Sequence, residues 1–467
     1  MISDLQIINH KSEMRLSQAL RIHPEEVVAF VGGGGKTTAM FRLADELVTQ
    51  GKRVITTTTT HLSIAQLPSS ATKIGCGRAR TLAPLARGGV NADSLEARHI
   101  LIVGDEVEAG KVVGVPPALI GELIALDVVD AVIYEADGAR MLPFKAPAAH
   151  EPVLSDATTL LVPVIGAGVF GAPLDDAHVH RAEIVARLAG ARLGDTVTPI
   201  IAARVMANAG GGLKGKPRAA RAIALVNQVE NDAQLDAART LARLLLGYAE
   251  IDAVVIGAVQ NAPNPIRETH RRVAAIVLAA GASTRMGGRV KQLLPWRGTT
   301  LVENVIAIAA QSSASETVIV LGAHAEEIRA TIRSGAGRVI VNREWETGHA
   351  SSIRAGLRVL SPQIDAAIFV NADQPLLTSD VLDALAQRYR ETDAPIVVPL
   401  YAGKRGSPVL FQRAHFEELA NLRDEQGGRE LLGKYRTKIE FVEFAEERLG
   451  FDVDTAEDYE SVRNQVF

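Results

Sequence analysis

Short apolar runs rich in β-branched residues recur along the chain, separated by longer segments of helical periodicity. Such runs are typical of parallel strands that are buried on both faces, with helices between them. The runs of the first half are residues 27–31, 53–55, 131–134, 159–165, 222–226 and 253–256. Those of the second half are residues 273–278, 317–321, 338–341, 366–370 and 395–399. The pattern predicts an α/β fold with two three-layer α/β/α domains.

A proline-containing segment lies between the two halves. Pro263 and Pro265 do not fit inside one helix or a central strand, and we expect the charged run at residues 266–272 to be solvated. The alternative is a long surface loop within one domain. A new strand, glycine loop and helix begin at Val273, which favours a boundary. We therefore predict domains at residues 1–265 and 272–467.

Composition and charge exclude several classes of protein. The 467 residues include 50 Lys+Arg and 54 Asp+Glu, a balance that argues against a nucleic-acid or polybasic membrane partner. The apolar stretch at residues 160–174 is too short to span a bilayer, and charges interrupt the N-terminal segment where a signal peptide would lie. Cys76 is the only cysteine, so no intramolecular disulfide forms, and packing is its expected role. We expect a cytoplasmic protein.

The loop after residues 273–278 carries phosphate-binding chemistry. Gly281 and Gly287 let backbone N–H groups approach a polyphosphate, because no Cβ stands in the way. Arg285 offers a forked donor to phosphate oxygens, and Lys291 offers a mobile positive charge. The loop therefore predicts a nucleotide-binding site with Arg285 and Lys291 as its cations.

Carboxylates follow at two later places in the same half. Asp373 comes directly after residues 366–370, where the mouth of a parallel strand would bring a Mg²⁺ ligand to the phosphates. Near the C-terminus, Asp452 and Asp454 offer a second pair. We predict Asp373 and Asp454 as Mg²⁺ ligands. The alternative is a helix cap, since Thr455 and Asp458 have the spacing of a capping box next to Asp454.

These features together resemble the MobA-like nucleotidyltransferases and, within them, the molybdenum cofactor cytidylyltransferases. The resemblance covers residues 273–463, and its motifs are residues 278–287, 291–296, 348–356, 371–375, 405–410 and 452–458. Residues 278–281 read Leu-Ala-Ala-Gly and residues 292–296 read Gln-Leu-Leu-Pro-Trp. Both segments favour cytidylyl over guanylyl transfer, and the fold implied is Rossmann-like.

The resemblance implies that a phosphate of molybdopterin attacks the α-phosphorus of CTP and that pyrophosphate leaves. The nucleophile is already an anion, so no Ser, Cys or His base is needed. Lys291, Arg285 and Mg²⁺ would neutralise charge in the transition state. The remaining nucleotide contacts implied are Leu278, Ala279, Ala280, Gly281, Ser351 and Ser352. Two alternatives stay open: a sugar or polyol phosphate as acceptor, and a non-catalytic chaperone that carries molybdopterin to a hydroxylase.

The first half contains a second glycine loop. Residues 32–38 read Gly-Gly-Gly-Gly-Lys-Thr-Thr directly after the run at residues 27–31, as in a compact phosphate-binding loop. Phe30 stands where the standard P-loop spacing has its first glycine. We predict a P-loop-like domain with phosphate contacts from Gly33, Gly34, Gly35, Lys36, Thr37 and Thr38.

Further polar residues follow the strands of this half. Glu135 and Asp137 come after residues 131–134, where an acidic side chain would coordinate Mg²⁺ or orient water. Asn227 begins Asn-Gln-Val-Glu, a degenerate form of a base-reading loop. Residues 56–60 are consecutive threonines, which fit either a switch-like segment or a continued strand.

With residues 142–147 and 150–152, this set resembles the selenium-dependent hydroxylase accessory proteins of the YqeC type over residues 24–262. The resemblance implies a context rather than a reaction, namely the maturation of molybdenum hydroxylases. The P-loop-like domain would bind ATP or GTP, and the context implies transient docking to such a hydroxylase. The second half points to the same context.

Overall fold

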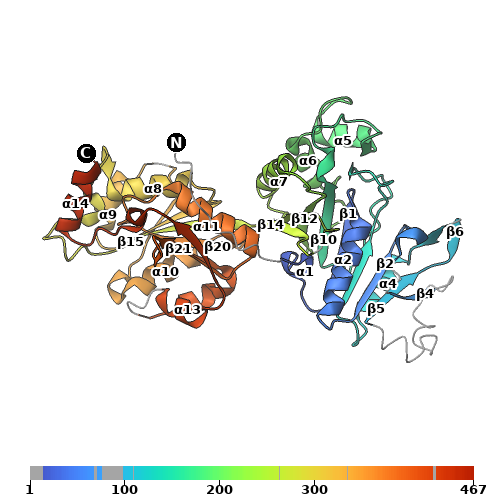
Figure 1. Ribbon diagram of the computed structural model, residues 1–467, viewed down its shortest axis with the longest axis horizontal. Helices are drawn as coiled ribbons and strands as arrows, with labels where there is room; N and C mark the ends of the chain where they lie inside the picture. Colours follow the sequence, from blue (N-terminus) through green and yellow to red (C-terminus); the bar gives the residue numbers. More distant parts are fainter. Residues whose placement is uncertain are drawn as a thin grey trace. The chain divides into compact units, whose positions relative to one another are not determined.

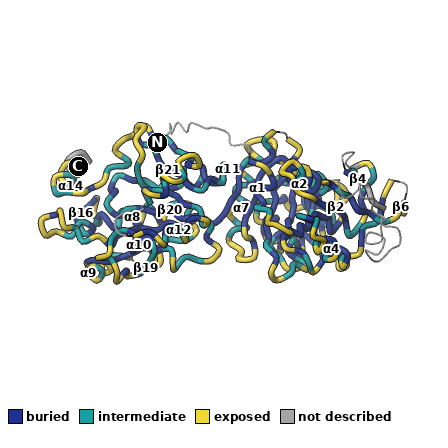
Figure 2. Tube along the Cα trace, turned by 90° about the horizontal axis from the view of Figure 1, so that it is seen from below, coloured by how far each residue is buried: buried dark blue, intermediate teal, exposed yellow. Residues whose placement is uncertain are grey.

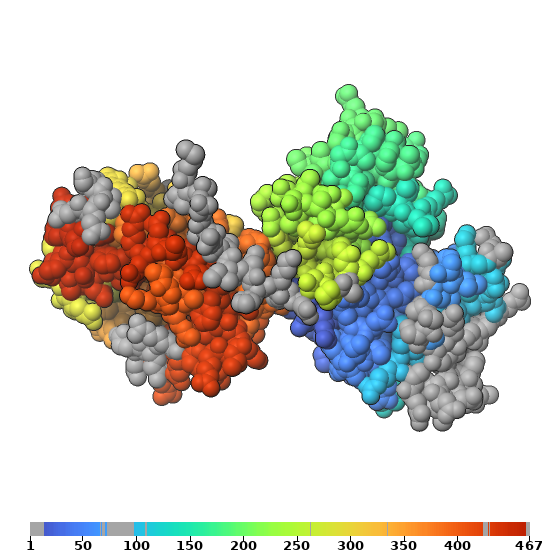
Figure 3. All heavy atoms as spheres, viewed as in Figure 1, coloured from blue at the N-terminus to red at the C-terminus, as the bar shows by residue number. Residues whose placement is uncertain are grey.

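The computed structural model describes residues 14–67, 71–75, 98–108, 110–261, 263–333, 335–423 and 428–466. The chain divides between His270 and Arg271 into two compact units (Figure 1). Cys76 lies outside the described residues. In the space-filling view the first unit runs from blue to lime and the second from yellow to red (Figure 3).

The first unit is built on a sheet with the strand order β14-β13-β12-β10-β1-β8-β2-β5-β4. Its neighbouring strands pair in parallel, except that β14 is antiparallel to β13. The strands are β1 (Glu26–Gly32), β2 (Val54–Thr58), β4 (Thr72–Gly75), β5 (His99–Val103), β8 (Ala131–Glu135), β10 (Leu160–Gly166), β12 (Arg221–Asn227), β13 (Ala253–Gly257) and β14 (Ile266–His270). The short strands β9 (Phe144–Lys145) and β11 (Val179–His180) pair apart from this sheet, as do β3 (His61–Ser63), β6 (Glu106–Glu108) and β7 (Lys111–Val113).

Helices cover both faces of this sheet, because side chains along a strand point alternately to either side. Val28 and Phe30 of β1 pack with α1 (Leu16–Ala19) and α2 (Lys36–Thr49). Val27, Ala29 and Val31 pack into the cluster on the opposite face. The helices that pack on this opposite face are α4 (Pro117–Ile124), α5 (Ala182–Ala189), α6 (Pro199–Met206) and α7 (Asp232–Leu245). In Figure 2 the buried residues, drawn in dark blue, follow the strands and form the core between the two layers of helices.

The second unit has a sheet with the strand order β19-β18-β15-β20-β23-β21-β22, and β24 pairs with β21. The strands β19, β18, β15 and β20 are parallel, whereas β23 runs antiparallel to β20 and β21. Their bounds are β15 (Arg272–Ala279), β18 (Glu316–Leu321), β19 (Arg338–Val341), β20 (Ile364–Asn371), β21 (Ile396–Tyr401), β22 (Lys404–Arg405), β23 (Val409–Gln412) and β24 (Ile439–Phe444). The hairpin β16 (Pro295–Trp296) and β17 (Thr299–Thr300) stands apart.

The helices of the second unit also lie on both faces of its sheet, and each face has its own apolar cluster. One face of the sheet carries α8 (Leu301–Gln311), α9 (Ala325–Thr331) and α11 (Ser379–Thr392). The other carries α10 (His349–Arg358), α12 (Phe416–Ala420) and α13 (Arg429–Lys434). The last helix, α14 (Ala456–Val466), packs into a smaller cluster. The predicted α/β class, with helices on both faces of parallel-rich sheets, is confirmed.

The charged run before the second unit is not solvated, contrary to the prediction. Residues 266–270 form β14, and Glu268, Thr269 and His270 are buried. Glu268 accepts hydrogen bonds from Arg239 and from His270, so its charge is compensated inside the unit. The two prolines therefore precede an antiparallel edge strand of the first unit instead of ending that unit.

The threonine run continues a strand. β2 extends to Thr58, and Thr58 Oγ1 donates to Glu135 O at 3.0 Å. Thr56 and Thr57 are fully buried. Among the described residues, no helix combines the length and apolar character needed to cross a membrane.

Candidate functional sites

The glycine loop of the first unit joins β1 to α2 and is packed against β10. The Gly34 N–H donates to Leu142 O at 3.1 Å. A Cβ on Gly34 would lie 2.1 Å from Gly166 N, and Gly34 has a φ of 75°. Both the close approach and the left-handed backbone require glycine at this position.

Lys36 begins α2 and lies among carboxylates. Its Nζ is 3.4 Å from Glu135 Oε1 and 3.3 Å from Asp137 Oδ1, and it donates to Gly32 O at 2.5 Å. Thr37 Oγ1 donates to Glu135 Oε2 at 2.7 Å, while Asp137 Oδ1 accepts the Gly32 N–H at 3.1 Å. The structure thus brings the predicted lysine, threonine and both acidic residues to one point beside the loop.

This arrangement keeps Lys36 charged. Burial alone would lower the pKa of Lys36, but Glu135 and Asp137 outweigh the burial and hold it above its usual value. Gly35 caps α2 without a side-chain hydrogen bond, and the N–H groups of a first helical turn have no acceptor within the helix. Lys36, Thr37 and Thr38 form that turn, so donors and positive charge occur together, as phosphate binding requires.

Asn227 supports the loop from the end of β12. Its Nδ2 donates to Gly34 O at 2.8 Å, and its Oδ1 accepts the Val259 N–H at 3.0 Å. The side chain is buried. Sequence reasoning assigned this residue to a base-reading loop, whereas its described contacts are with backbone atoms of the glycine loop and of the segment after β13.

The motif at residues 142–147 and 150–152 folds against the same loop. Lys145 Nζ lies 3.0 Å from Asp137 Oδ2 and donates to Glu151 Oε2 at 2.6 Å. Arg181 donates to both Glu151 oxygens, at 2.6 and 3.2 Å. Burial alone would raise the pKa of Glu151, but Arg181 and Lys145 lower it to about 2. The sequence pattern did not predict that the charges of this motif lie beside the loop.

In the second unit, the loop after β15 is tied to Lys291. Ser283 Oγ accepts the Lys291 N–H at 2.9 Å and donates to Gln292 Oε1 at 2.9 Å. Gln292 Nε2 donates to Gly281 O at 2.9 Å. Gly287 has a φ of 62° and open space around its Cβ position. The loop therefore has a fixed beginning at Gly281 and an exposed tip.

Lys291 lies between two of the predicted carboxylates. Its Nζ is 2.7 Å from Asp373 Oδ2 and 3.6 Å from Asp454 Oδ1. The Arg285 guanidinium is 3.8 Å from Asp454 Oδ2, and its side chain is 73% exposed. Both predicted cations and both predicted metal ligands are thus brought to one place by segments far apart in sequence.

A small apolar cluster produces this juxtaposition. Met286, Trp296, Val453 and Tyr459 pack together beneath the site. The Val453 N–H also donates to Asp373 O at 2.9 Å. Because Met286 follows Arg285 and Val453 precedes Asp454, burying the two apolar residues positions the two charged ones.

Asp454 does not cap α14. Asp458 Oδ2 accepts the Thr455 N–H at 2.8 Å, and the Asp458 N–H donates to Thr455 Oγ1 at 3.2 Å. Thr455 and Asp458 therefore form the capping box, while the Asp454 carboxylate contacts Lys291 and Arg285.

Asp373 and Asp454 are the residues that could hold a divalent cation together with substrate phosphates. Asp373 Oδ1 is buried and has no hydrogen-bond partner in the described part of the chain. Burial, together with the charges of Asp373 and Asp454, raises the pKa of Asp452 to about 6. Within the described residues, His, Cys, Asp and Glu form no metal-binding group of three or more. Mg²⁺ is commonly held by one or two carboxylates plus substrate phosphates, which fits Asp373 and Asp454.

Ser351 and Ser352 lie in the first turn of α10 and are held by a residue that the sequence reasoning missed. Asn342 Nδ2 donates to Ser351 Oγ at 2.8 Å and to Ser352 Oγ at 3.1 Å. All three side chains are buried. Asn342 directly follows β19, and a polar residue after an apolar run is the signal that could have revealed it.

The predicted backbone contacts lie at the end of β15. Leu278, Ala279 and Ala280 are buried, and Leu278 pairs with Asn371 of β20. Ala280 O accepts the Ala323 N–H at 3.1 Å. The segment is therefore fixed between β18 and β20 and leads directly into Gly281.

A glycine loop, a lysine and aspartates at the carboxyl ends of a largely parallel sheet form an arrangement that can bind a nucleotide phosphate. Residues 275–439 match the MobA-like NTP transferase domain. The second unit is accordingly a nucleotidyltransferase. Residues 28–183 match the YqeC protein family.

Individual relatives cover both parts. The protein YqeC of Escherichia coli (strain K12) is 28% identical over 239 residues, which are 51% of this chain and 89% of that protein. Nicotine blue oxidoreductase of Paenarthrobacter nicotinovorans is 30% identical over 196 residues, which are 40% of this chain and 93% of that protein. The crystal structure of Rv0371c from Mycobacterium tuberculosis H37Rv is 30% identical and covers 41% of this chain and 98% of its own, with a TM-score of 0.37. The chain belongs to the MobA-like NTP transferases, and residues 28–183 of its first unit are similar to the YqeC protein family.

Proposed function

We propose that the second unit transfers CMP from CTP to Mo-molybdopterin, giving molybdopterin cytosine dinucleotide and pyrophosphate. The observation that carries the proposal is the position of Lys291 between Asp373 and Asp454, beside the glycine loop. The Leu-Ala-Ala-Gly sequence of residues 278–281 supports CTP as the nucleotide. The proposed acceptor follows from the resemblance to the cytidylyltransferases.

Charge neutralisation is the main catalytic effect in this proposal. The attacking molybdopterin phosphate is an anion, so the site needs no general base. Lys291 and Arg285 stabilise the negative charge that develops on the α-phosphate and on the leaving pyrophosphate. Asp373 and Asp454 would hold Mg²⁺, which polarises phosphate oxygens when bound.

The remaining predicted residues orient the nucleotide. The backbone of Leu278, Ala279, Ala280 and Gly281 holds the base and phosphates, and Gly287 allows the loop tip to turn. Ser351 and Ser352 support the ribose or base from the start of α10. Correct orientation of two reacting phosphates lowers the entropic part of the barrier.

Release of pyrophosphate from CTP and Mo-molybdopterin tests the proposal. Asp373→Ala and Lys291→Ala should each lower turnover by about 100-fold or more, since each removes charge stabilisation of the transition state. Lys404→Ala is the matched control, because Lys404 forms an exposed ion pair with Glu447. Unchanged turnover in either site variant would refute the assigned roles.

A comparison of CTP, GTP and ATP under the same conditions decides the nucleotide. A carrier of molybdopterin would bind CTP and release no pyrophosphate. An enzyme for another acceptor would release pyrophosphate with a sugar or polyol phosphate and not with molybdopterin. Either result would replace the cytidylyltransferase proposal by one of these alternatives.

For the first unit we propose a nucleotide-dependent accessory role in the maturation of a molybdenum hydroxylase, with ATP or GTP bound at the glycine loop. The supporting observation is the group formed by the buried residues Lys36, Glu135 and Asp137 with Thr37. In this proposal Gly33, Gly34, Gly35 and Thr38 contribute backbone contacts. Loss of Mg²⁺–ATP or Mg²⁺–GTP binding in Lys36→Ala is the expected result, and the lack of binding by the unaltered protein would refute the role.

A further inference from the structure

The Asp137 carboxylate contacts two buried lysines, Lys36 and Lys145. Its Oδ1 is 3.3 Å from Lys36 Nζ, and its Oδ2 is 3.0 Å from Lys145 Nζ. The Gly32 N–H completes its contacts at 3.1 Å. The side chain of Asp137 is 2% exposed, so its charge depends on these neighbours instead of on water.

Lys145 lies closer to its carboxylates than Lys36, whose ammonium group is 3.3 and 3.4 Å from its two carboxylates. The Lys145 side chain is fully buried, and its ammonium group has the three acceptors that three protons can satisfy. These are Asp137, Glu151 Oε2 at 2.6 Å and Gly138 O at 2.6 Å. Lys145 is therefore a fixed charge, held by its own partners.

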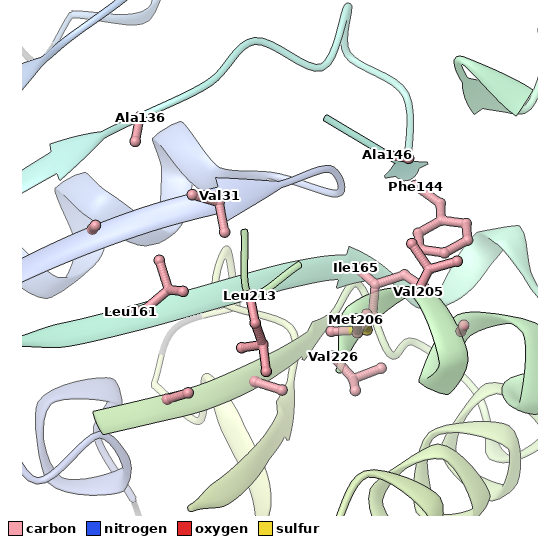
Figure 4. Packing of buried hydrophobic residues seen from close by; sticks show 14 of the residues in the cluster. Val31, Ala136, Phe144, Ala146, Leu161, Ile165, Val205, Met206, Leu213 and Val226 are labelled. Carbon is pink, nitrogen blue, oxygen red and sulfur yellow. The ribbon is translucent and has the colours of Figure 1, made fainter. Parts of the chain in front are cut away.

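The surrounding backbone also keeps Lys145 in place. Phe144 and Ala146, on either side of it, are buried in the same cluster as Ile165 and Val205 (Figure 4). Phe144 points toward Ile165 and Val205 in that view. The packing of Phe144 and Ala146 therefore fixes the backbone that carries Lys145.

We propose that Lys145 is a positioning residue that compensates Asp137 when Lys36 leaves this carboxylate to bind nucleotide phosphate. The inference rests on the proposed binding of nucleotide at the glycine loop. Lys36 is shared by Glu135, Asp137 and Gly32 O, and these contacts compete with a phosphate. With Lys145 in place, Asp137 keeps one cation after Lys36 has moved.

Without Lys145, the same movement would leave a buried carboxylate without a cation. Such a group is costly, and the cost falls only on the nucleotide-bound state. Lys145→Met should therefore weaken binding of Mg²⁺–ATP or Mg²⁺–GTP by about tenfold or more, which corresponds to one charge-assisted hydrogen bond. Lys145 would affect affinity in this way without touching the nucleotide.

A double-mutant cycle with Asp137→Asn tests the proposal in the full-length protein. Calorimetric titration with each Mg²⁺–nucleotide gives the dissociation constant, and the signal lost in Lys36→Ala identifies the first-unit site. We expect Lys145→Met to weaken binding about tenfold when Asp137 is present and less than about twofold when Asp137→Asn is also present, because the neutral amide needs no compensation. An equal effect in both backgrounds would overturn the proposal.

Glu151→Gln is the matched control for stability, since it removes a second charged partner of Lys145 and leaves Lys145 beside Asp137. It should lower the melting temperature and change the dissociation constant by less than about twofold. If Glu151→Gln and Lys145→Met weaken binding equally, the cluster is only structural and the proposal fails. If Lys145→Met binds nucleotide as well as the unaltered protein does, only this inference is overturned. If the unaltered protein binds no nucleotide, the proposed nucleotide role of the first unit is overturned as well.

Discussion

Gly34 in the first loop is required by its left-handed backbone and by the close approach of Gly166, and alanine substitutions can distinguish the contributions of these two features to stability. The residue has a φ of 75°, and a Cβ would lie 2.1 Å from Gly166 N and 2.6 Å from Gly166 Cα. The obstructing atoms are backbone atoms of β10, which also pairs with β1 and β12. They cannot move aside as a flexible side chain would.

The expected loss of stability follows from these two terms. A left-handed backbone costs a residue with a Cβ about 1–2 kcal/mol, and forcing an atom into packed surroundings costs about 1–3 kcal/mol. The sum for Gly34→Ala is about 2–5 kcal/mol. Gly171→Ala is the matched control, because Gly171 has a φ of 89° and nothing lies within 4 Å of its Cβ position. That variant should lose only the backbone part, about 1–2 kcal/mol.

The two units can be followed separately during unfolding. Both tryptophans, Trp296 and Trp345, lie in the second unit, so their fluorescence reports on that unit. Circular dichroism reports on both units. Gly34→Ala should lower the melting temperature of the first unit, which is seen only by circular dichroism, by about 5–15 °C. It should also weaken Mg²⁺–nucleotide binding by about tenfold or more. Equal shifts for Gly34→Ala and Gly171→Ala would refute the steric argument.

Two further predictions concern the second unit. Asp452 has a pKa of about 6 in the folded state against its ordinary value of 3.8, so the native state binds this proton more tightly and stability falls as the pH rises through this range. Because the side chain of Asp452 is exposed, solvent screening reduces the size of this effect. Asp452→Asn should raise the free energy of unfolding by about 1 kcal/mol at pH 8 and by less at pH 5, as measured by urea unfolding followed by tryptophan fluorescence. A gain independent of pH would contradict this. Asn342→Ala removes the hydrogen-bond donor to Ser351 and Ser352. It should raise the KM for CTP by about tenfold with little change in kcat. A loss confined to kcat would contradict the positioning role of Asn342.

Much of the fold could be predicted from the sequence because strand burial is recorded directly in apolar runs. The runs at residues 27–31, 131–134 and 273–278 became β1, β8 and β15, at the centres of their sheets. The antiparallel strand β23 and the edge strand β14 were not predicted. Pairing direction depends on the connections between strands, and β14 hides its charges by contacts with α7.

The candidate sites show the same division. The grouping of Lys36 and of Lys291 with Asp373 beside the glycine loops could be predicted, because parallel strands bring their carboxyl ends to one edge of the sheet. The pairing of Lys145 with Asp137 could not, because the residues meet only after β9 has folded against the loop. Asn342 was missed for a similar reason, since its partners begin a helix that follows later in the chain.

The sequence by itself determined the class of fold, the two glycine loops and the kinds of charge beside them. These properties depend on local patterns, namely strand periodicity and glycine followed by lysine. Only the tertiary structure decided which charges share a site. Burial of Met286 with Val453 brings Arg285 to Asp454, and burial of Phe144 and Ala146 brings Lys145 to Asp137. Apolar packing between distant segments therefore set the electrostatics of both sites.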